Sequence, residues 1–264
     1  MRYLNLTAIA FCCLPLTHSY AAEMEHSHPQ AKDHPFNETM PQNLTGQTVD
    51  LKTADGKNFK AYVSGPEDAK AAVLIVHEWW GLNDHIRGQA DILAKQGYRA
   101  LAIDLYGDKV TSDAAMAGKL MGEVDQTQAN AKLKAALASL KAPGRKLATL
   151  GWCFGGGESL QATLTDPSAV SATVIYYGLM VTDVPTLKTL NGPVLGIFAT
   201  RDKWISPDKV SAFEQAMKDA GKSLDVHNYD ADHAFANPSA PSYNSAAAQD
   251  AWQVTQEFLA VNLK

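Results

Sequence analysis

The sequence contains, at residues 149–157, the stretch TLGWCFGGG. An apolar, strand-type segment precedes it and a helix-type segment follows, so Cys153 lies at the turn between them in the pattern G-x-C-x-G. Such a turn strains the backbone of its central residue, and Gly151 and Gly155 leave room where a Cβ would collide with neighbouring backbone. The free N–H groups at the helix start favour a thiolate and can stabilise an oxyanion. The stretch therefore predicts a nucleophilic cysteine, the alternative being a buried cysteine in a glycine-rich turn.

Strand-type and helix-type segments alternate on both sides of this turn. Residues 49–53 and 59–63 predict a hairpin turned around Asp55-Gly56, and residues 72–77 are a continuous apolar run typical of a central parallel strand. Further strands are expected at 99–104, 147–151, 172–176, 194–200 and 224–229, and helices at 84–95, 114–121, 126–140, 154–163, 209–220 and 244–260. The alternation predicts an α/β fold with a mostly parallel central sheet flanked by helices on both faces.

Several residues capable of acid–base or nucleophilic chemistry follow the ends of these strands: Glu78, Asp104, Cys153, Asp202 and His233. Ligands of parallel sheets bind beyond the carboxyl ends of the strands, so we expect these residues to meet in one cleft. The chain order of nucleophile, acid and histidine is that of the α/β-hydrolases, in which the acid orients an imidazole that moves protons. Cys153, Asp202 and His233 are thus the predicted catalytic triad.

Three nearby residues are alternatives for the acid and the base. Asp208 follows Pro207 and is suited to cap the next helix. Asp232 is too close in sequence to its neighbour His233 to orient it easily, and His227 lies inside an expected strand. These positions leave Asp202 and His233 as the favoured pair.

The N-terminal part of the chain differs from the remainder in composition. Residues 1–21 have an apolar run followed by small residues, which is the pattern of a secretory signal peptide. Residues 22–47 carry histidine and proline with little apolar periodicity and predict a poorly ordered leader without a fixed geometry for metal ligands. Residues 48–264 are long enough for one α/β-hydrolase domain.

The cysteine count supports an exported protein. The chain has three cysteines, and Cys12 and Cys13 fall within the predicted signal peptide. Once the signal is removed, Cys153 has no partner for an internal disulfide, so its presence in an oxidising compartment indicates burial or a chemical purpose. The bulky Phe11 stands where a lipoprotein signal has a small residue, which favours a soluble periplasmic or secreted protein over a lipid-anchored one.

The charge distribution points to a small-molecule partner. The formal net charge is −5, and no cluster of Lys or Arg forms a basic face that would suit nucleic acid or an anionic membrane. We expect no metal, no cofactor and no membrane contact after signal removal, and a monomer or a small homo-oligomer.

The motifs together resemble the dienelactone hydrolase family of α/β-hydrolases across residues 49–263. The resemblance rests on the cysteine turn, on HEWWGLN at residues 77–83, on DLYG at residues 104–107, and on the spacing to Asp202 and His233. The combination of a cysteine turn with H-E-x-x-G-x-N is its most specific element, because ordinary esterases place serine in the turn and usually lack the glutamate.

The resemblance implies a role for each of four residues. Cys153 is the nucleophile, His233 the base and Asp202 its orienting acid, while Glu78 contacts the thiol in the resting enzyme and moves aside, or takes its proton, when substrate arrives. A carboxylate near the sulfur disfavours the thiolate and keeps it less open to oxidation. The alternative for Glu78 is a surface carboxylate after a strand.

The fold implied by the resemblance also places the oxyanion donors and the pocket. The backbone N–H groups of Phe154 and Trp79 are the expected donors to the oxyanion. The aromatic residues expected to wall the substrate pocket, or else to pack in the core, are Trp80, Tyr106, Trp204 and Phe235.

Two departures from the family bear on the substrate. Family members that act on dienelactone hold its carboxylate with two arginines, and the corresponding positions here are Asp108 and Asn237. Lys109 and Arg201 are the candidate replacements. We therefore expect hydrolysis of a neutral or differently charged small ester or lactone through an acyl-thioenzyme, rather than of dienelactone itself. The rival functions are a small-molecule-binding protein with little catalysis and a thiol redox protein, which would lack a resolving cysteine.

Overall fold

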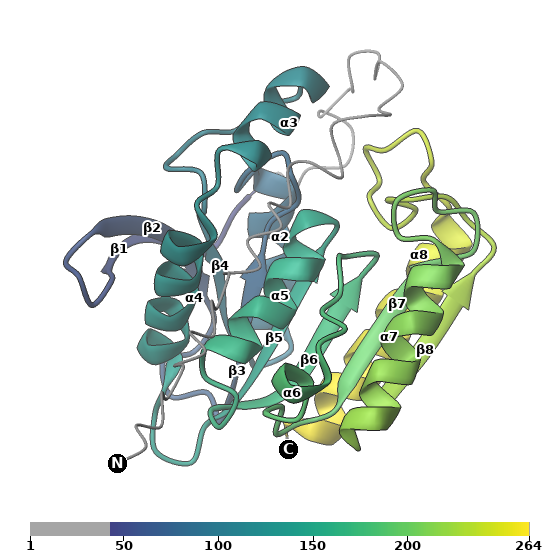
Figure 1. Ribbon diagram of the computed structural model, residues 1–264. Coiled ribbons are helices and arrows are strands. Elements are labelled where there is room, and N and C mark those ends of the chain that lie inside the picture. Colours follow the sequence, from purple (N-terminus) through teal and green to yellow (C-terminus); the bar gives the residue numbers. More distant parts are fainter. Residues whose placement is uncertain (1–42, 264) are drawn as a thin grey trace, which may run out of the picture.

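The structure is a computed structural model that describes residues 43–263 (Figure 1). The predicted signal peptide, residues 1–21, and the leader up to residue 42 lie outside the described residues.

One sheet of eight strands forms the centre of the described chain, in the order β1-β2-β4-β3-β5-β6-β7-β8. The strands are β1 (Gln47–Lys52), β2 (Asn58–Ser64), β3 (Ala71–Val76), β4 (Arg99–Ile103), β5 (Lys146–Trp152), β6 (Val170–Tyr176), β7 (Val194–Ala199) and β8 (Leu224–Tyr229). The first two strands form the predicted hairpin, and β2 joins β4 antiparallel. From β4 to β8 all neighbours are parallel. The predicted α/β fold with a mostly parallel sheet is confirmed.

Helices connect the parallel strands and cover both faces of the sheet (Figure 1). They are α2 (Asp84–Lys95), α3 (Ala114–Gly122), α4 (Gln126–Leu140), α5 (Phe154–Thr165), α6 (Val184–Leu187), α7 (Pro207–Ala220) and α8 (Ser245–Asn262). The short helix α6 was not expected from the sequence, because a four-residue helix is too short to show helical periodicity. Ser206 caps α7, so Asp208, expected as the cap, lies instead in the first turn of the helix.

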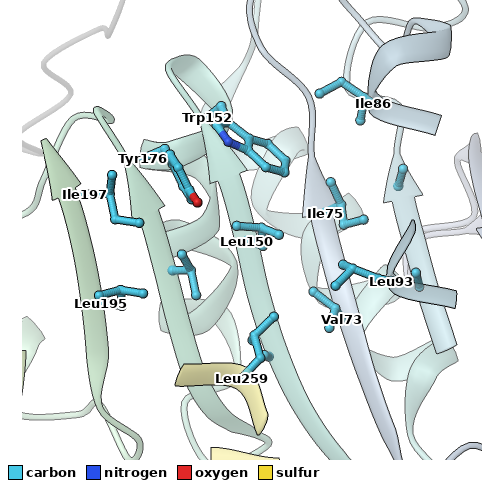
Figure 2. Packing of buried hydrophobic residues seen from close by; sticks show 14 of the residues in the cluster. Val73, Ile75, Ile86, Leu93, Leu150, Trp152, Tyr176, Leu195, Ile197 and Leu259 are labelled. Carbon is cyan, nitrogen blue, oxygen red and sulfur yellow. The ribbon is translucent and has the colours of Figure 1, made fainter. Parts of the chain in front are cut away.

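Alternate side chains of the strands supply two cores, one on each face. Figure 2 shows the face covered by α2 and α8, where Val73, Leu150 and Ile197 of the sheet belong to one hydrophobic cluster with Leu93 and Leu259 of these helices. The opposite face packs against α3 to α7. Each fully buried Leu, Ile or Val stabilises the fold by about 1.5–3 kcal/mol. The sheet therefore holds its strand ends rigidly, and these ends carry the candidate site.

No helix in residues 43–263 is long and apolar enough to cross a membrane.

Candidate active site

Cys153 stands between the end of β5 and the start of α5, with a left-handed backbone (φ 55°, ψ −120°). Its N–H donates to the carbonyl of Tyr176 at 3.0 Å, which ties the turn to β6. A Cβ at Gly151 would overlap the backbone of Gly155, and a Cβ at Gly155 would overlap the carbonyl oxygen of Val76. The glycines therefore allow α5 to begin directly above the sheet, and a non-glycine residue with positive φ marks a constrained position.

Cys153, His233 and Asp202 form a continuous chain of contacts. His233 Nε2 lies 3.2 Å from Cys153 Sγ, and His233 Nδ1 lies 2.6 Å from Asp202 Oδ2. Asp202 is fixed in turn, because its Oδ1 accepts the N–H groups of Trp204 and Ile205 at 2.8 and 2.9 Å. The structure thus brings together three residues that lie far apart in the sequence, in the geometry of a nucleophile, a base and an orienting acid.

His233 and Asp202 shift each other's pKa in opposite directions. Burial lowers the pKa of His233, but the nearby Cys153 charge and the hydrogen bond to Asp202 outweigh burial and raise that pKa above its ordinary value. Burial raises the pKa of Asp202, but the hydrogen bond and charge of His233 bring that pKa below its usual range. The raised pKa of His233 and the lowered pKa of Asp202 both favour an imidazolium hydrogen-bonded to a carboxylate.

Ser242 and Trp204 hold the histidine in place. Ser242 Oγ donates to the carbonyl oxygen of His233 at 2.6 Å. The Trp204 ring meets the imidazole edge-on, with centroids 5.1 Å apart. Contacts to the His233 backbone and to its ring therefore both restrain the position of the imidazole.

Glu78 lies buried in the site, but its hydrogen bond goes to Asn237 and not to the thiol. Asn237 Nδ2 donates to Glu78 Oε2 at 2.6 Å, while Asn237 Oδ1 accepts the N–H of Ser239 at 2.8 Å, which fixes the amide with its donor side toward the carboxylate. Within residues 43–263 no hydrogen bond joins Glu78 to the sulfur, because Cys153 Sγ pairs with His233 and Asn237 donates to the carboxylate. The alternative of a surface carboxylate does not hold either, since Glu78 is 3% exposed.

Burial raises the pKa of Glu78 to about 7, although His233 and the Asn237 amide lower it. The carboxylate and an imidazolium at His233 therefore stabilise each other. The sequence identified Asn237 only as the position of a missing arginine, and its link to Glu78 spans 159 positions, beyond the reach of any local pattern.

The segments of the two expected oxyanion donors lie side by side. Phe154 is the first residue of α5, where backbone N–H groups have no partner within the helix. Trp79 follows the end of β3, and the ring of its near neighbour His77 lies 5.9 Å from that of Phe154. Helix α5 also begins against the carbonyl groups of Val76 and His77, at Gly155.

The expected pocket aromatics differ in position. Trp80 is buried with its ring 4.7 Å from that of Trp79, and Tyr106 packs against His77 at 4.6 Å. Trp204 lies against the imidazole of His233, as described above. Phe235 has no exposed surface, and its ring packs against that of Tyr229 in the core.

Tyr177 is a site residue that the sequence interpretation missed. It has a positive φ of 32°, is fully buried, and meets His233 and Phe235 edge-on at 5.1 and 5.5 Å. Burial, together with the charges of Glu78 and Cys153, raises the pKa of its hydroxyl well above the usual value. Tyr177 follows the end of β6, so the strand-end rule that selected the other residues would also have selected it.

Two of the charged residues weighed for an anionic substrate, Asp108 and Arg201, have partners of opposite charge. Asp108 forms a salt bridge with Lys60 at 2.9 Å. Arg201 pairs with Asp230 and Asp232 at the surface. No group of His, Cys, Asp and Glu in residues 43–263 has a geometry that would hold a metal ion.

Comparison with known proteins agrees with the motifs and the geometry. The family model described as "Dienelactone hydrolase family" matches residues 59–263. Two relatives named "Putative carboxymethylenebutenolidase" are similar: that of Saccharolobus solfataricus is 30% identical, covering 78% of this chain and 95% of its own, and that of Methylorubrum extorquens is 33% identical, covering 70% of each. A crystal structure titled "Putative Dienelactone Hydrolase", from Klebsiella pneumoniae, is 28% identical with a TM-score of 0.71 and covers 82% of this chain and 99% of its own.

Proposed function

Because this chain belongs to the dienelactone hydrolase family, we propose that it is a carboxylic ester hydrolase that cleaves a small ester or lactone through Cys153, His233 and Asp202. The observation that carries the proposal is the continuous contact from Cys153 Sγ through the imidazole to Asp202, at 3.2 and 2.6 Å. A protein that only binds its ligand has no need for an oriented base beside a strained cysteine.

In the first half of the reaction His233 Nε2 holds the proton of the Cys153 thiol. The thiolate attacks the ester carbonyl carbon, and the developing oxyanion accepts hydrogen bonds from the N–H groups of Phe154 and Trp79. The C–O bond to the leaving group then breaks, and the imidazolium gives its proton to the leaving oxygen. The product is an alcohol and an acyl-thioenzyme.

In the second half His233 removes a proton from water, which attacks the thioester carbonyl. The C–S bond breaks, the sulfur returns as the thiolate beside the imidazolium, and a carboxylic acid leaves. Asp202 keeps its hydrogen bond to Nδ1 throughout, which holds the ring in the tautomer that presents Nε2 to the sulfur.

The substrate class follows from the charges around the site. The buried Glu78 places a carboxylate beside His233, where an anionic substrate would be repelled, and Asn237 offers a neutral amide. Asp108 is paired with Lys60 and supplies no cation to hold a carboxylate. Arg201 is neutralised by two aspartates. These features support a neutral ester or lactone in preference to dienelactone, and comparable kcat/KM values for dienelactone and uncharged esters would contradict this part of the proposal.

The decisive experiment is the pre-steady-state hydrolysis of neutral and anionic aryl esters and lactones, before and after alkylation of Cys153. We expect a burst of aryl alcohol whose size equals the free thiol, and loss of turnover on alkylation. If no ester is hydrolysed while the thiol still reacts fully with the alkylating reagent, the proposed hydrolysis is wrong. Ligand binding or thiol redox chemistry is then the better account of the protein.

Replacing Asp202 with Asn separates hydrolysis from binding. The amide disrupts the tautomer of His233, so we expect kcat to fall by about 10⁴-fold while ligand affinity changes little. The measurement is kcat by steady-state kinetics, with ligand affinity by calorimetry on the alkylated protein. Hydrolysis within about tenfold of the wild-type rate in Asp202→Asn would argue that the acid has no catalytic role.

We also infer that the protein is exported, with residues 1–21 as a cleaved signal. The support is the sequence pattern of that segment and the single remaining thiol. Expression of the full-length chain in a Gram-negative host should yield a periplasmic protein whose N-terminus begins near residue 22, as read by intact mass. Full-length protein in the cytoplasmic fraction would contradict export.

A further inference from the structure

A cavity lies beyond the carboxyl end of β4, between residues 105–109, the end of α3 and one side of α4. It has a volume of about 260 Å³, smaller than the ~300–1,000 Å³ typical of sites for drug-sized ligands. Its apolar wall includes Leu120 and Val124. None of Cys153, His233 and Asp202 lines it, although Tyr106, one of the expected pocket aromatics, does.

Lys132 places a cation in the wall of this cavity, which is also lined by Lys109 and by the carboxylates of Glu123 and Asp125. Lys132 Nζ donates to the carbonyl oxygen of Leu105 at 3.3 Å, and within residues 43–263 no carboxylate lies within salt-bridge distance. An ammonium has three N–H donors, so two are available to a ligand. Burial lowers the pKa of Lys132 and Asp104 raises it, as expected of a half-buried cation whose counter-charge is remote.

The carboxylates around the cavity have other partners. Asp104 accepts the backbone N–H groups of Tyr106, at 2.8 Å, and of Asp108. Asp125 caps α4 by accepting the N–H of Gln128 at 3.0 Å.

The third acidic group is likewise engaged. Glu123 lies 3.8 Å from Lys119 in an exposed salt bridge. None of the three carboxylates therefore neutralises Lys132 directly, and an anionic ligand would not have to displace a salt bridge from it.

A second cation, Lys109, belongs to the same wall. Lys109 is exposed and has no salt bridge to a described residue.

We propose that this cavity binds a small organic carboxylate, with its apolar body against Leu120 and Val124 and its carboxylate between Lys132 and Lys109. The cavity is too small for a large acid, its cations select against neutral molecules, and its apolar wall selects against inorganic anions. The site does not depend on the proposed hydrolysis, because it shares no residue with the triad.

The test is calorimetric titration of benzoate, and of benzamide as the neutral isostere, into the protein with Cys153 alkylated. We expect benzoate to bind, and benzamide to bind at least about tenfold more weakly, because a charge-assisted hydrogen bond is lost. Lys132→Met should weaken benzoate at least about tenfold, and Lys132→Arg should retain most of the affinity. Lys134→Met on the exposed side of the same helix is the matched control and should leave the affinity unchanged.

Lys109→Ala provides a second variant at an exposed position where the fold is not at risk, and it should weaken benzoate several-fold. Each of the following results would overturn the proposal: equal affinity in Lys132→Met and wild type, equal affinity for benzoate and benzamide, or no binding of benzoate at millimolar concentration. Binding to unmodified protein that disappears on alkylation of Cys153 would assign the carboxylate to the catalytic site instead.

Discussion

Glu78 is a buried carboxylate whose hydrogen-bond partner is the neutral amide of Asn237, while its electrostatic partner is His233. Burial raises the pKa of Glu78 to about 7, so it changes charge within the range in which the enzyme would operate. Below this pKa the residue is neutral, and above it the carboxylate stabilises the imidazolium that forms when Cys153 loses its proton. The protonation state of Glu78 thus makes the stability of the His233 imidazolium depend on pH.

We therefore expect kcat/KM for a neutral ester to rise as pH increases through about 7, and Glu78→Gln to lose this rise because it cannot ionise. At pH 8 the variant should be about 10–100-fold less active than the wild type. The measurement is kcat/KM from pH 5 to 9.

Glu158→Gln is the matched control for this profile. Glu158 is also fully buried with a pKa raised by burial to about 7, but it pairs with Gln126 rather than facing His233. Its replacement should leave the rise intact. The proposed role of Glu78 fails if Glu78→Gln keeps the wild-type profile, or if Glu158→Gln loses it.

At the scale of elements, the start of helix α5 fixes the position of Cys153, because this helix begins in contact with the backbone at the end of β3. Gly155→Ala would force a Cβ into the carbonyl oxygens of Val76 and His77. Overpacking of this kind costs about 1–3 kcal/mol or more, and it would also shift Cys153 away from His233. We expect a lower melting temperature together with a loss of ester hydrolysis.

Gly118→Ala in α3 is the control, because a Cβ there meets no atom within 4 Å. Alanine in a helix interior is favoured over glycine by about 0.5–1 kcal/mol, so this variant should be as stable as the wild type or more so. Equal melting temperatures for the two alanine variants would show that the close approach of α5 to β3 is not required.

Glu158 lies in the buried stretch of the same helix, with one oxygen bound by Gln126 at 3.0 Å and the other without a partner among the described residues. Burial raises its pKa from 4.5 to about 7, so the unfolded chain releases the proton first as pH rises from 4.5 to 7. The folded state therefore loses up to about 3 kcal/mol of stability across that window.

Glu158→Gln removes this loss because the amide does not ionise. The melting temperature of the variant relative to the wild type should increase between pH 5 and pH 8, as followed by circular dichroism. A difference that stays constant over this range would mean that Glu158 keeps the same charge in the folded and unfolded chain.

At the scale of the whole molecule, the two cores and the candidate site lie within residues 44–263. The N-terminal edge of this unit is fixed by Asp91, whose Oδ2 accepts the N–H of Thr45 at 2.8 Å, and by Tyr62, whose hydroxyl accepts the N–H of Gly46. Asp91 and Tyr62 also bond to each other at 3.0 Å. This network closes the hairpin edge against α2.

Deleting residues 1–42 should therefore leave the melting temperature and kcat/KM unchanged. Deleting residues 1–46 removes the donors to Asp91 and Tyr62 and should cost about 1–3 kcal/mol, measured by denaturant unfolding. A large loss in the shorter deletion would show that the N-terminal residues contribute to the fold.

The fold class and the position of the candidate nucleophile, Cys153, follow from the sequence, because both depend on local rules. Periodicity separates strands from helices, a cysteine between glycines marks the turn, and the strand-end rule selects Asp202 and His233. Other features depend on which side chains meet in the folded molecule. These are the hydrogen bond from Asn237 to Glu78 and the absence of a salt bridge between Lys132 and any described residue. Such contacts join residues far apart in the chain and are settled by packing and burial, so only the tertiary structure could decide them.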